Sequence, residues 1–515
     1  MKKIALVMGL IIIAFNSYSQ SYFNKIYPYL DCFQNRTANL IIVNNKINVF
    51  AEKVKFGSSF HTPTIIEIDS IGTIKNRIDP LIDTLNSYIS HFTSIEIKLN
   101  ERNYFTSGMA AFNSNLAYPF IIEYDTAFNI LWKKVYNEVS PSYYVTNAAR
   151  QLNDNGFMMI GYRDISPYSI QSYVLKTNRL GIKKWEKYYD FEQGKSSSIY
   201  QMSYNSDSTS YLFSGITTPS ENNDLSDGFI INTDTAGNIR WKQSYHKSWY
   251  DSQLLIRNDP SCDTVVIGLQ TYALGNYDAG IPYYIGNGDV RILKIHANSG
   301  NILWEKTLNV SKEKIMPARL LVQQNGDIVV CGYFSNYNGS DSAWAAKISK
   351  TGDLVWIKAY NYTTNLNWAG IQHFADVKET NDGGYIFAGV ASVSESNGHP
   401  SSWVVKTDSM GNAPGSVAIT VGINEINSTN IEIKQLKVYP NPAKNFFSLE
   451  YDLSVSELPL LLKITDAAGR TIEEKQLKNK RDIVAINCSQ YAKGNYNCII
   501  FEGQNLKQMT KIVIE

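Results

Sequence analysis

The chain has 515 residues, with 48 Lys and Arg against 47 Asp and Glu. This length exceeds one ordinary domain unless a repeat array extends it. The even balance of charge excludes the basic footprint of a nucleic-acid-binding protein and also an acidic solvating tail. The 34 tyrosines, without dominant Ala and Leu, favour β-strands.

The N-terminal residues 1–19 have the pattern of a secretory signal peptide. Lys2 and Lys3 supply the charged start, and an apolar run follows over Ile4–Phe15. The segment Ser17–Ser19 supplies small residues for cleavage. An uncleaved anchor is the alternative. No later segment reaches the roughly 18 apolar residues that a membrane helix requires, so we expect no transmembrane segment.

Between residues 40 and 415 one pattern recurs. A polar turn such as Asn153–Gly156 leads into an apolar strand that closes on a glycine, as in Phe157–Gly161. After a loop come a second strand, a tight turn and a third strand with a tryptophan. The closing glycines are Gly108, Gly161, Gly215, Gly268, Gly332 and Gly389, and the tryptophans are Trp132, Trp185, Trp241, Trp304 and Trp356.

These repeats of about 55 residues predict β-meanders that stack as a β-propeller, because one four-stranded sheet cannot bury both faces alone. We count seven copies over residues 20–415; six or eight blades are alternatives, since the first copy is degenerate. A strand at Leu40–Val43, or one before it, is expected to complete the last blade. The tryptophans are expected to fill the gaps between blades. The stretch Gly300–Lys306 resembles the blade motif of quinoprotein-like propellers, which supports the fold and carries no chemistry.

The repeat pattern ends before residues 416–435, which we interpret as a linker. Short strands resume over residues 436–515, and their number predicts a small β-sandwich. The tail contains Val438–Ala443, then Ile464–Arg470, then Lys493–Tyr496, and ends with Lys511–Glu515.

The order of these motifs resembles the C-terminal sorting domain of proteins that Bacteroidetes export through the type IX secretion system. The resemblance implies recognition by the secretion machinery and delivery to the cell surface or the medium. The residues that carry it are Pro440, Asn441, Pro442, Gly469, Arg470, Gly494, Tyr496 and Lys511.

The sequence predicts no catalytic, cofactor-binding or metal-binding residue, because no nucleophile elbow, phosphate loop or paired-histidine motif is present. Oxygen-rich turns such as Asn381-Asp382 suit either calcium or ordinary turn chemistry. Cys488 and Cys498 lie on predicted neighbouring strands and are either a disulfide or two buried thiols. The six histidines are scattered and are expected to be surface or packing residues: His61, His91, His246, His296, His373 and His399.

Taken together, these features predict that the protein is an exported, non-enzymatic propeller that binds a protein or a glycan. Aromatic pairs near loops suit such binding, although packing over blade edges is their other use. These pairs are Tyr143-Tyr144, Tyr188-Tyr189, Trp249-Tyr250 and Tyr283-Tyr284. An extracellular hydrolase or lyase is the alternative, and carboxylates converging on the central channel would favour it. Quinone redox chemistry is discounted because no adjacent cysteine pair is present.

Overall fold

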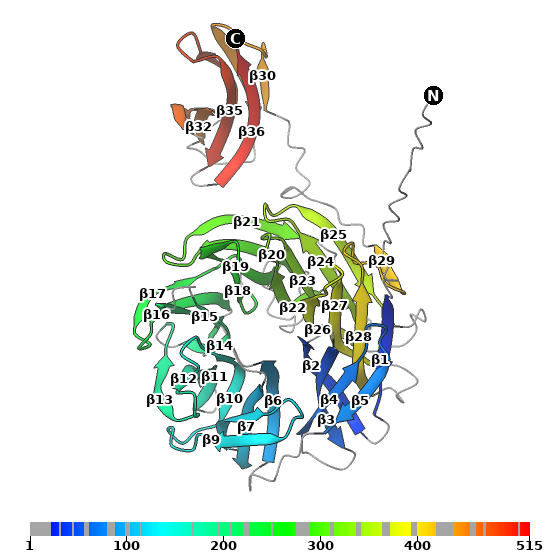
Figure 1. The fold of residues 1–515 in the computed structure, drawn as a ribbon. Helices are drawn as coiled ribbons and strands as arrows, with labels where there is room; N and C mark the ends of the chain where they lie inside the picture. The colour runs from blue at the N-terminus through cyan, green and yellow to red at the C-terminus, as the bar shows by residue number, and fades with distance from the viewer. Residues whose placement is uncertain are drawn as a thin grey trace, which may run out of the picture. The chain divides into compact units, whose positions relative to one another are not determined.

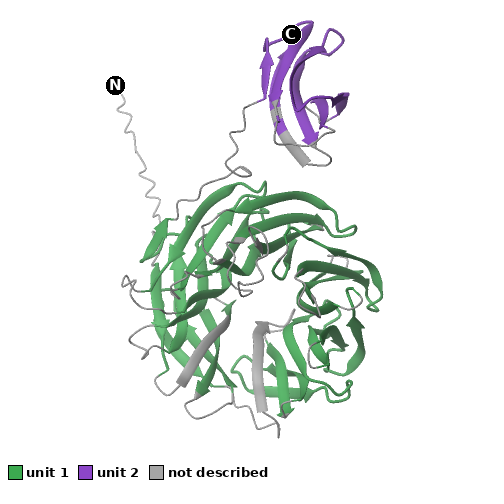
Figure 2. Cartoon of the chain, turned by 180° about the vertical axis from the view of Figure 1, so that it is seen from behind, with its two compact units in different colours: residues 1–423 green, residues 424–515 purple. Residues whose placement is uncertain are grey.

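The computed structural model contains only β-strands as regular elements in the residues it describes, which confirms the all-β prediction. Two compact units divide the chain, residues 1–423 and 424–515 (Figure 2). The predicted signal peptide 1–19 lies outside the described residues. These are 22–29, 32–43, 46–55, 61–79, 88–97, 103–113, 115–166, 169–192, 195–204, 209–219, 226–248, 251–273, 288–308, 314–335, 341–362, 371–392, 399–418, 436–453, 460–466, 470–502 and 505–515.

The first four sheets of the first unit are four-stranded antiparallel meanders, each formed by consecutive strands. Sheet 1 comprises β2 (Cys32–Val43), β3 (Lys46–Lys55), β4 (His61–Ile68) and β5 (Ile74–Ile78). Sheet 2 comprises β6 (Tyr88–Ile97), β7 (Tyr104–Asn113), β8 (Leu116–Tyr124) and β9 (Ile130–Val135). Sheet 3 comprises β10 (Tyr144–Gln151), β11 (Phe157–Ser166), β12 (Ser169–Thr177) and β13 (Lys183–Tyr189). Sheet 4 comprises β14 (Lys195–Tyr204), β15 (Ser210–Pro219), β16 (Asp227–Asp234) and β17 (Ile239–Ser244).

Three more sheets follow, and the last two each recruit an additional strand. Sheet 5 comprises β18 (Leu255–Asp259), β19 (Cys262–Ala273), β20 (Gly288–His296) and β21 (Ile302–Leu308). Sheet 6 comprises β22 (Lys314–Val322), β23 (Ile328–Ser335), β24 (Asp341–Ile348), β25 (Leu354–Tyr360) and β29 (Ser416–Ala418). Sheet 7 comprises β26 (Gln372–Glu379), β27 (Tyr385–Ser392), β28 (Pro400–Thr407) and, from the N-terminus, β1 (Phe23–Tyr27).

The seven sheets succeed one another around a ring, with the first strand of each nearest the centre (Figure 1). Each sheet contacts the next, and sheet 7 contacts sheet 1 through β26, β27 and β28 against β2. β1 pairs antiparallel with β28 over the whole of Phe23–Tyr27. Of the two strands expected to complete the last sheet, the earlier one does so, while Leu40–Val43 belongs to sheet 1.

The repeated glycines each lie inside the second strand of their sheet. The prediction that they end these strands is therefore wrong. The first strand of sheet 3 has a β-bulge between Thr146 and Ala148, opposite Gly161. The bulge carries the Val145 carbonyl toward Gly161, where an added Cβ would lie 1.9 Å from that oxygen. Only a residue without a Cβ fits this approach. An added Cβ at Gly215, Gly332 or Gly389 would likewise clash with a backbone carbonyl oxygen of the neighbouring strand.

The predicted role of the tryptophans is confirmed by their contacts with the next sheet. Trp132 on β9 packs on the turn between β12 and β13, where an added Cβ on Gly181 would lie 2.7 Å from Trp132 Cζ3. Four further pairs repeat this contact: Trp185 with Gly237, Trp241 with Gly300, Trp304 with Gly352, and Trp356 with Gly411.

A tyrosine four residues after the tryptophan completes the contact. Tyr136 donates its hydroxyl to the Gly181 carbonyl at 2.9 Å, and Tyr189, Tyr245 and Tyr360 bond the turns of Gly237, Gly300 and Gly411 in the same way. On β1, Phe23 takes the tryptophan position against Gly72, and Tyr27 donates to the Gly72 carbonyl at 2.9 Å. The N-terminal strand therefore joins sheet 7 to sheet 1 with the contact used along the ring.

The predicted linker 416–435 begins with residues that belong to a sheet. Ser416–Ala418 form β29, which pairs with the edge strand β25 of sheet 6. A turn and a side-chain hydrogen bond hold the segment before it: Ser416 N donates to the Ala413 carbonyl, and Asn24 Nδ2 donates to the Pro414 carbonyl. The remainder of the linker lies outside the described residues.

The second unit contains two antiparallel sheets with one shared core, as expected for a sandwich. One sheet comprises β30 (Lys437–Tyr439), β31 (Phe446–Asp452) and β34 (Arg481–Asn487). The other comprises β33 (Thr471–Leu477), β32 (Leu460–Asp466), β35 (Gly494–Glu502) and β36 (Asn505–Ile514). Alternate residues of facing strands, including Phe447, Leu462, Ile500 and Ile512, fill the core.

Candidate functional site

First strands from five sheets converge on a polar pocket of about 180 Å³ at the centre of the ring. Asn39 comes from β2, Arg150 from β10, Arg257 from β18, Arg319 from β22 and Asp376 from β26. A strand exposes alternate residues on one face, so each innermost strand presents polar side chains to the channel.

Cations outnumber carboxylates in this pocket. Arg150, Arg257, Arg319 and Lys378 line it, whereas Asp376 is the one carboxylate among its described lining residues. Three arginines and one lysine against one carboxylate give the pocket a positive potential. The surrounding protein strengthens this potential, because it has a lower dielectric constant than water.

Asp376 is held ionised by its surroundings. Its Oδ2 accepts the Leu40 N–H at 2.9 Å, and its Oδ1 lies 3.0 Å from Arg319 Nε. Burial alone would raise the pKa of Asp376, but Lys378, Arg319 and the Leu40 N–H outweigh burial and lower the pKa below its usual range. A carboxylate with a lowered pKa is a poor proton acceptor and a poor proton donor at neutral pH.

Arg150 differs from its neighbours because no hydrogen bond or ion pair engages its side chain within the described part of the chain. Arg257 donates to Gln201 Oε1 at 2.6 Å, and Arg319 pairs with Asp376. A second pocket of about 170 Å³ continues the channel and is also lined by Arg150 and Arg319, together with Tyr200 and Gln201 of β14. The Arg150 guanidinium is thus available to a ligand in the channel.

Sequence reasoning missed these cations, although a signal was present. Arg150 and Lys378 each stand eleven residues before the glycine of their own repeat, and they pair with Met158 and Ile386, each three residues before that glycine. Arg257 has the same spacing in sequence but pairs with Ile267, directly before Gly268, as Arg319 pairs with Cys331 directly before Gly332.

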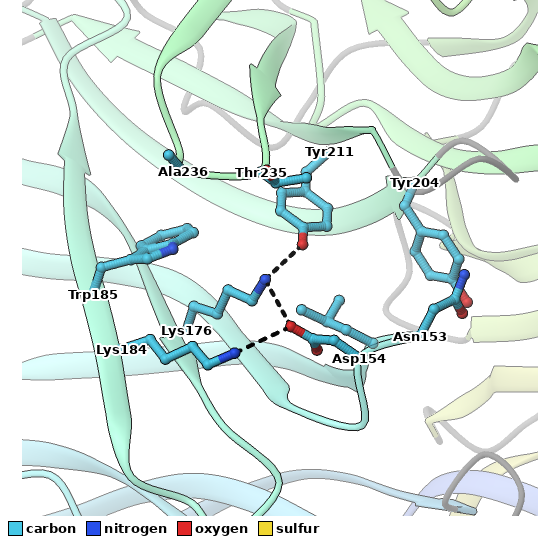
Figure 3. Close-up of a pocket in the computed structure, with 10 residues that line it drawn as sticks. Asn153, Asp154, Lys176, Lys184, Trp185, Tyr204, Tyr211, Thr235 and Ala236 are labelled. Atoms are coloured by element: carbon cyan, nitrogen blue, oxygen red, sulfur yellow. Dashed lines mark hydrogen bonds and ion pairs between the residues drawn. The ribbon is translucent and has the colours of Figure 1, made fainter.

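A pocket of about 450 Å³ lies on the turn side of the sheets, between sheets 3 and 4 (Figure 3). Lys176 Nζ donates to the Tyr211 hydroxyl at 2.9 Å and lies 3.1 Å from Asp154 Oδ2, which Lys184 also approaches at 3.4 Å. Burial opposes ionisation of Asp154, yet Lys176 keeps its pKa below the usual value. Similar Lys–Asp pairs occur within three other sheets, at Lys294–Asp259, Lys347–Asp327 and Lys406–Asp382. This pocket is therefore part of the scaffold.

The histidines have different surroundings. His61 pairs with Glu52 at 3.0 Å, and His373 pairs with Asp341 at 2.5 Å while stacking on Tyr333. His246 is the one histidine among the described residues that meets two carboxylates, Asp227 and Asp251. The side chain of His91 lies outside the description.

Turn chemistry accounts for the described Asp-rich turns. Asp125 Oδ1 accepts the N–H groups of Ala127 and Asn129, and these hydrogen bonds, with the Asn129 side chain first, lower the pKa of Asp125. Asp69, Asp234 and Asp408 cap their turns in the same way. Asp382 of the pair Asn381-Asp382 binds Lys406.

Of the described aromatic pairs, Tyr144, Tyr188 and Tyr189 take part in packing, which is the second of the two uses that the sequence left open. Tyr144 and Tyr189 are buried, and the Tyr144 and Tyr188 hydroxyls share a hydrogen bond of 2.7 Å. Arg163 stacks over the Tyr188 ring at 3.6 Å. The pairs Trp249-Tyr250 and Tyr283-Tyr284 lie outside the described residues.

In the second unit, Cys488 and Cys498 are both free thiols in the core. Burial raises the pKa of the Cys498 thiol to about 12, so it is protonated and unreactive at neutral pH.

The described sorting residues meet at one end of the second unit. Asn441 Nδ2 donates to the Lys511 carbonyl at 3.1 Å, and Asn441 Oδ1 accepts the Val513 N–H at 2.9 Å. Tyr496 stands opposite Ile512 on β36 and opposite Asp466 on β32.

Arg470 extends this end, since its Nε donates to Asp466 Oδ2 at 2.7 Å. Pro440, Asn441, Pro442, Arg470, Gly494 and Lys511 are exposed there, and Tyr496 is buried beneath them. Gly469 lies outside the described residues.

Comparison with known proteins identifies the tail. Residues 437–515 match the secretion system C-terminal sorting domain. The protein is therefore exported by that system, to the cell surface or the medium. No curated protein sequence is significantly similar to the chain. No helix among the described residues has the length and apolar character to cross a bilayer.

Solved structures with distant similarity include hydrazine synthase of Kuenenia stuttgartiensis, at 9% identity and a TM-score of 0.43, covering 72% of this chain and 95% of that one. A puromycin hydrolase has 9% identity and a TM-score of 0.45, covering 84% and 62%. A polysaccharide lyase has 10% identity and a TM-score of 0.42, covering 76% and 93%. Similarity this low carries no argument about activity.

Proposed function

We propose that the exported protein is a seven-bladed β-propeller that binds an anionic group of a protein or glycan in its central channel. Residues 1–19 would act as a signal peptide in a bacterium of the Bacteroidetes. The observation that carries the binding proposal is the gathering of Arg150, Arg257, Arg319 and Lys378 around a single paired carboxylate. The contact between sheets 7 and 1 supports the propeller.

Guanidinium groups suit this role because their planar donors pair with two oxygens of a carboxylate or sulfate. Arg150 has no partner within the described residues, so a ligand would not have to break an existing ion pair to reach it. The alternative, a hydrolase or lyase, needs a proton-transfer group in the channel. Asp376 is a weak candidate for it, because Arg319 and Lys378 stabilise its ionised form.

The test is binding of the full mature chain to a sulfated polysaccharide, a polyglutamate peptide and a neutral polysaccharide. We expect binding to an anionic probe that weakens with added salt, and at least a tenfold loss of affinity in Arg150→Gln, because a charge-assisted hydrogen bond contributes about 1.5–3 kcal/mol. The control is Arg179→Gln, which removes the same charge from an exposed turn. Equal affinities of the two variants would contradict the proposal, and cleavage of a probe would favour the enzyme.

The exposed end of the second unit is proposed as the surface that the secretion machinery recognises. Asn441 supports this role, because its side chain joins the Pro440–Pro442 segment to the C-terminal strand. Deleting residues 437–515 should leave the protein inside the cell envelope. Asn441→Asp should reduce export, since a carboxylate would face the Lys511 carbonyl that now accepts the amide. Normal export of both variants would rule out this surface.

A further inference from the structure

A cluster of two aspartates and a histidine lies where sheet 4 connects to sheet 5. Asp227 begins β16, His246 follows the end of β17, and Asp251 precedes β18. Because β16 and β17 are antiparallel, the first two positions lie at the same end of sheet 4. Asp251 is brought to them by Ser226, whose carbonyl accepts the Asp251 N–H at 2.9 Å and whose hydroxyl donates to the Asp251 carbonyl at 2.9 Å.

The three side chains face one another at short range. His246 Nδ1 lies 2.7 Å from Asp227 Oδ1. One potential ligand atom from each of the three residues lies within 4.8 Å of the other two. Asp227 and Asp251 are 7% and 0% exposed, whereas the His246 side chain is 53% exposed. The cluster is closed on its carboxylate side and open to solvent on its imidazole side.

Asp251 provides the second observation. Its Oδ2 accepts the Lys247 N–H at 2.7 Å. Its Oδ1 is buried and accepts no hydrogen bond within the described part of the chain. A buried carboxylate oxygen without a partner is costly, and the neighbouring Asp227 adds a second negative charge. A bound cation would compensate both.

We propose that Asp227, His246 and Asp251 form a binding site for Zn²⁺. Two carboxylate oxygens and one imidazole nitrogen are ligands that Zn²⁺ accepts, and three protein ligands leave a fourth position for water. Ca²⁺ fits less well, because it prefers six or more oxygen ligands. Ligand atoms of a tetrahedral Zn²⁺ lie about 3.3 Å apart, so the His246–Asp227 contact opens slightly and Asp251 approaches. The ion would fix the connection between the two sheets, and its open position would face solvent through His246.

The experiment uses the full mature chain, stripped with a chelator and desalted. It carries Cys262→Ser so that the exposed thiol does not bind the metal. Titration calorimetry with ZnCl₂, MnCl₂ and CaCl₂ measures affinity, and thermal unfolding measures stabilisation. We expect one Zn²⁺ per chain, tighter than Ca²⁺, with a rise in Tm, because a ligand of the native state stabilises it.

Asp251→Asn and His246→Gln should each weaken Zn²⁺ binding at least tenfold and abolish the rise in Tm. His246→Gln changes a half-exposed side chain, so it tests the site even if the buried substitution disturbs folding. The matched control is His373→Gln, at a His–Asp pair that has no third ligand within the described residues. Absence of Zn²⁺ binding in the parent chain, or equal affinity in all three variants, would overturn the proposal.

Discussion

The junction of sheets 2 and 3 and the junction of sheets 1 and 2 contain equivalent spaces. A large ring fills this space in both junctions, but the two rings come from opposite sides. In the first, Trp132 on the outer strand of sheet 2 packs on the turn that begins at Asn178 in sheet 3. Gly181 is the third residue after Asn178 and has φ 70°. In the second, the outer strand β5 has the exposed Asn76 where the tryptophan would be, since Asn76 pairs with Glu67 as Trp132 pairs with Glu123.

The turn of sheet 2 compensates for the missing tryptophan. Phe128 takes the glycine position, with φ 63°, although a positive φ is unfavourable for a side chain of this kind. Its ring is 5% exposed and stacks on Tyr104 at 4.6 Å between centroids. Each junction thus needs one large ring, and the turn residue is glycine where the neighbouring sheet supplies the ring and Phe where it does not. Packing density, rather than turn conformation, decides the residue.

Removing the ring from the junction between sheets 7 and 1 should have the largest effect. Phe23 and Tyr27 are 5% and 3% exposed, and they join the N-terminal strand to sheet 1. Each buried aromatic replaced by Ala typically costs about 3–5 kcal/mol. For Phe23→Ala with Tyr27→Ala we therefore expect a loss of more than about 5 kcal/mol, a large part of the roughly 5–15 kcal/mol by which native proteins are stable.

Tryptophan fluorescence during urea unfolding measures this loss in the ring alone, because all nine tryptophans precede residue 404. Leu180→Ala, at a side chain 61% exposed, serves as the control and should change stability by less than about 0.5 kcal/mol. If the double variant unfolds within about 1 kcal/mol of the parent chain, the N-terminal strand does not close the ring.

An intermediate loss of stability is expected when the junction of sheets 1 and 2 is given the residues of the other junctions, a tryptophan on the outer strand and a glycine in the turn. Phe128→Gly removes a buried ring but relieves an unfavourable φ, for a net loss of about 2–3 kcal/mol. Asn76→Trp alone should also destabilise, since two rings would compete for one space. The double variant should lose at least about 1 kcal/mol less stability than the sum of the losses in the two single variants, as a double-mutant cycle measures. Additive effects would show that the two positions do not share a space.

The sequence was sufficient for the repeats and the strands because the pattern is local. The polar turn at Asn153–Gly156 and the strand after it are encoded within ten residues, and hairpin chemistry fixes them. The need for glycine at position 161 could not be predicted from the sequence, because the Val145 carbonyl that excludes a side chain belongs to a bulge on another strand. The role of Phe128 was hidden for the same reason, since its partner position Asn76 lies in the preceding sheet.

The candidate site was less predictable than the fold. Arg150 on sheet 3 and Lys378 on sheet 7 have three sheets between them along the chain, and they line one pocket only because the sheets succeed one another around a common centre. The cluster of Asp227, His246 and Asp251 is compact in sequence, but its spacing follows no metal motif, because a strand and two turns bring the three residues together. In contrast, the order of the motifs along the chain is enough to predict the sorting residues Pro440–Pro442 and Lys511, and Asn441 joins them in the structure.

The smallest effect concerns the tyrosine hydroxyl of each junction. Tyr136→Phe removes one hydrogen bond, to the Gly181 carbonyl, and should cost about 1 kcal/mol. The junction of sheets 5 and 6 offers the reverse change, because Leu308 occupies the tyrosine position four residues after Trp304. Leu308→Tyr places a hydroxyl near the Gly352 carbonyl and should gain up to about 1 kcal/mol if the larger ring fits the 5% exposed site. Opposite signs in urea unfolding would show that the hydroxyl stabilises a junction independently of the ring, whereas a loss in both variants would show that Leu308 is fitted to its own junction, as Phe128 is to its own.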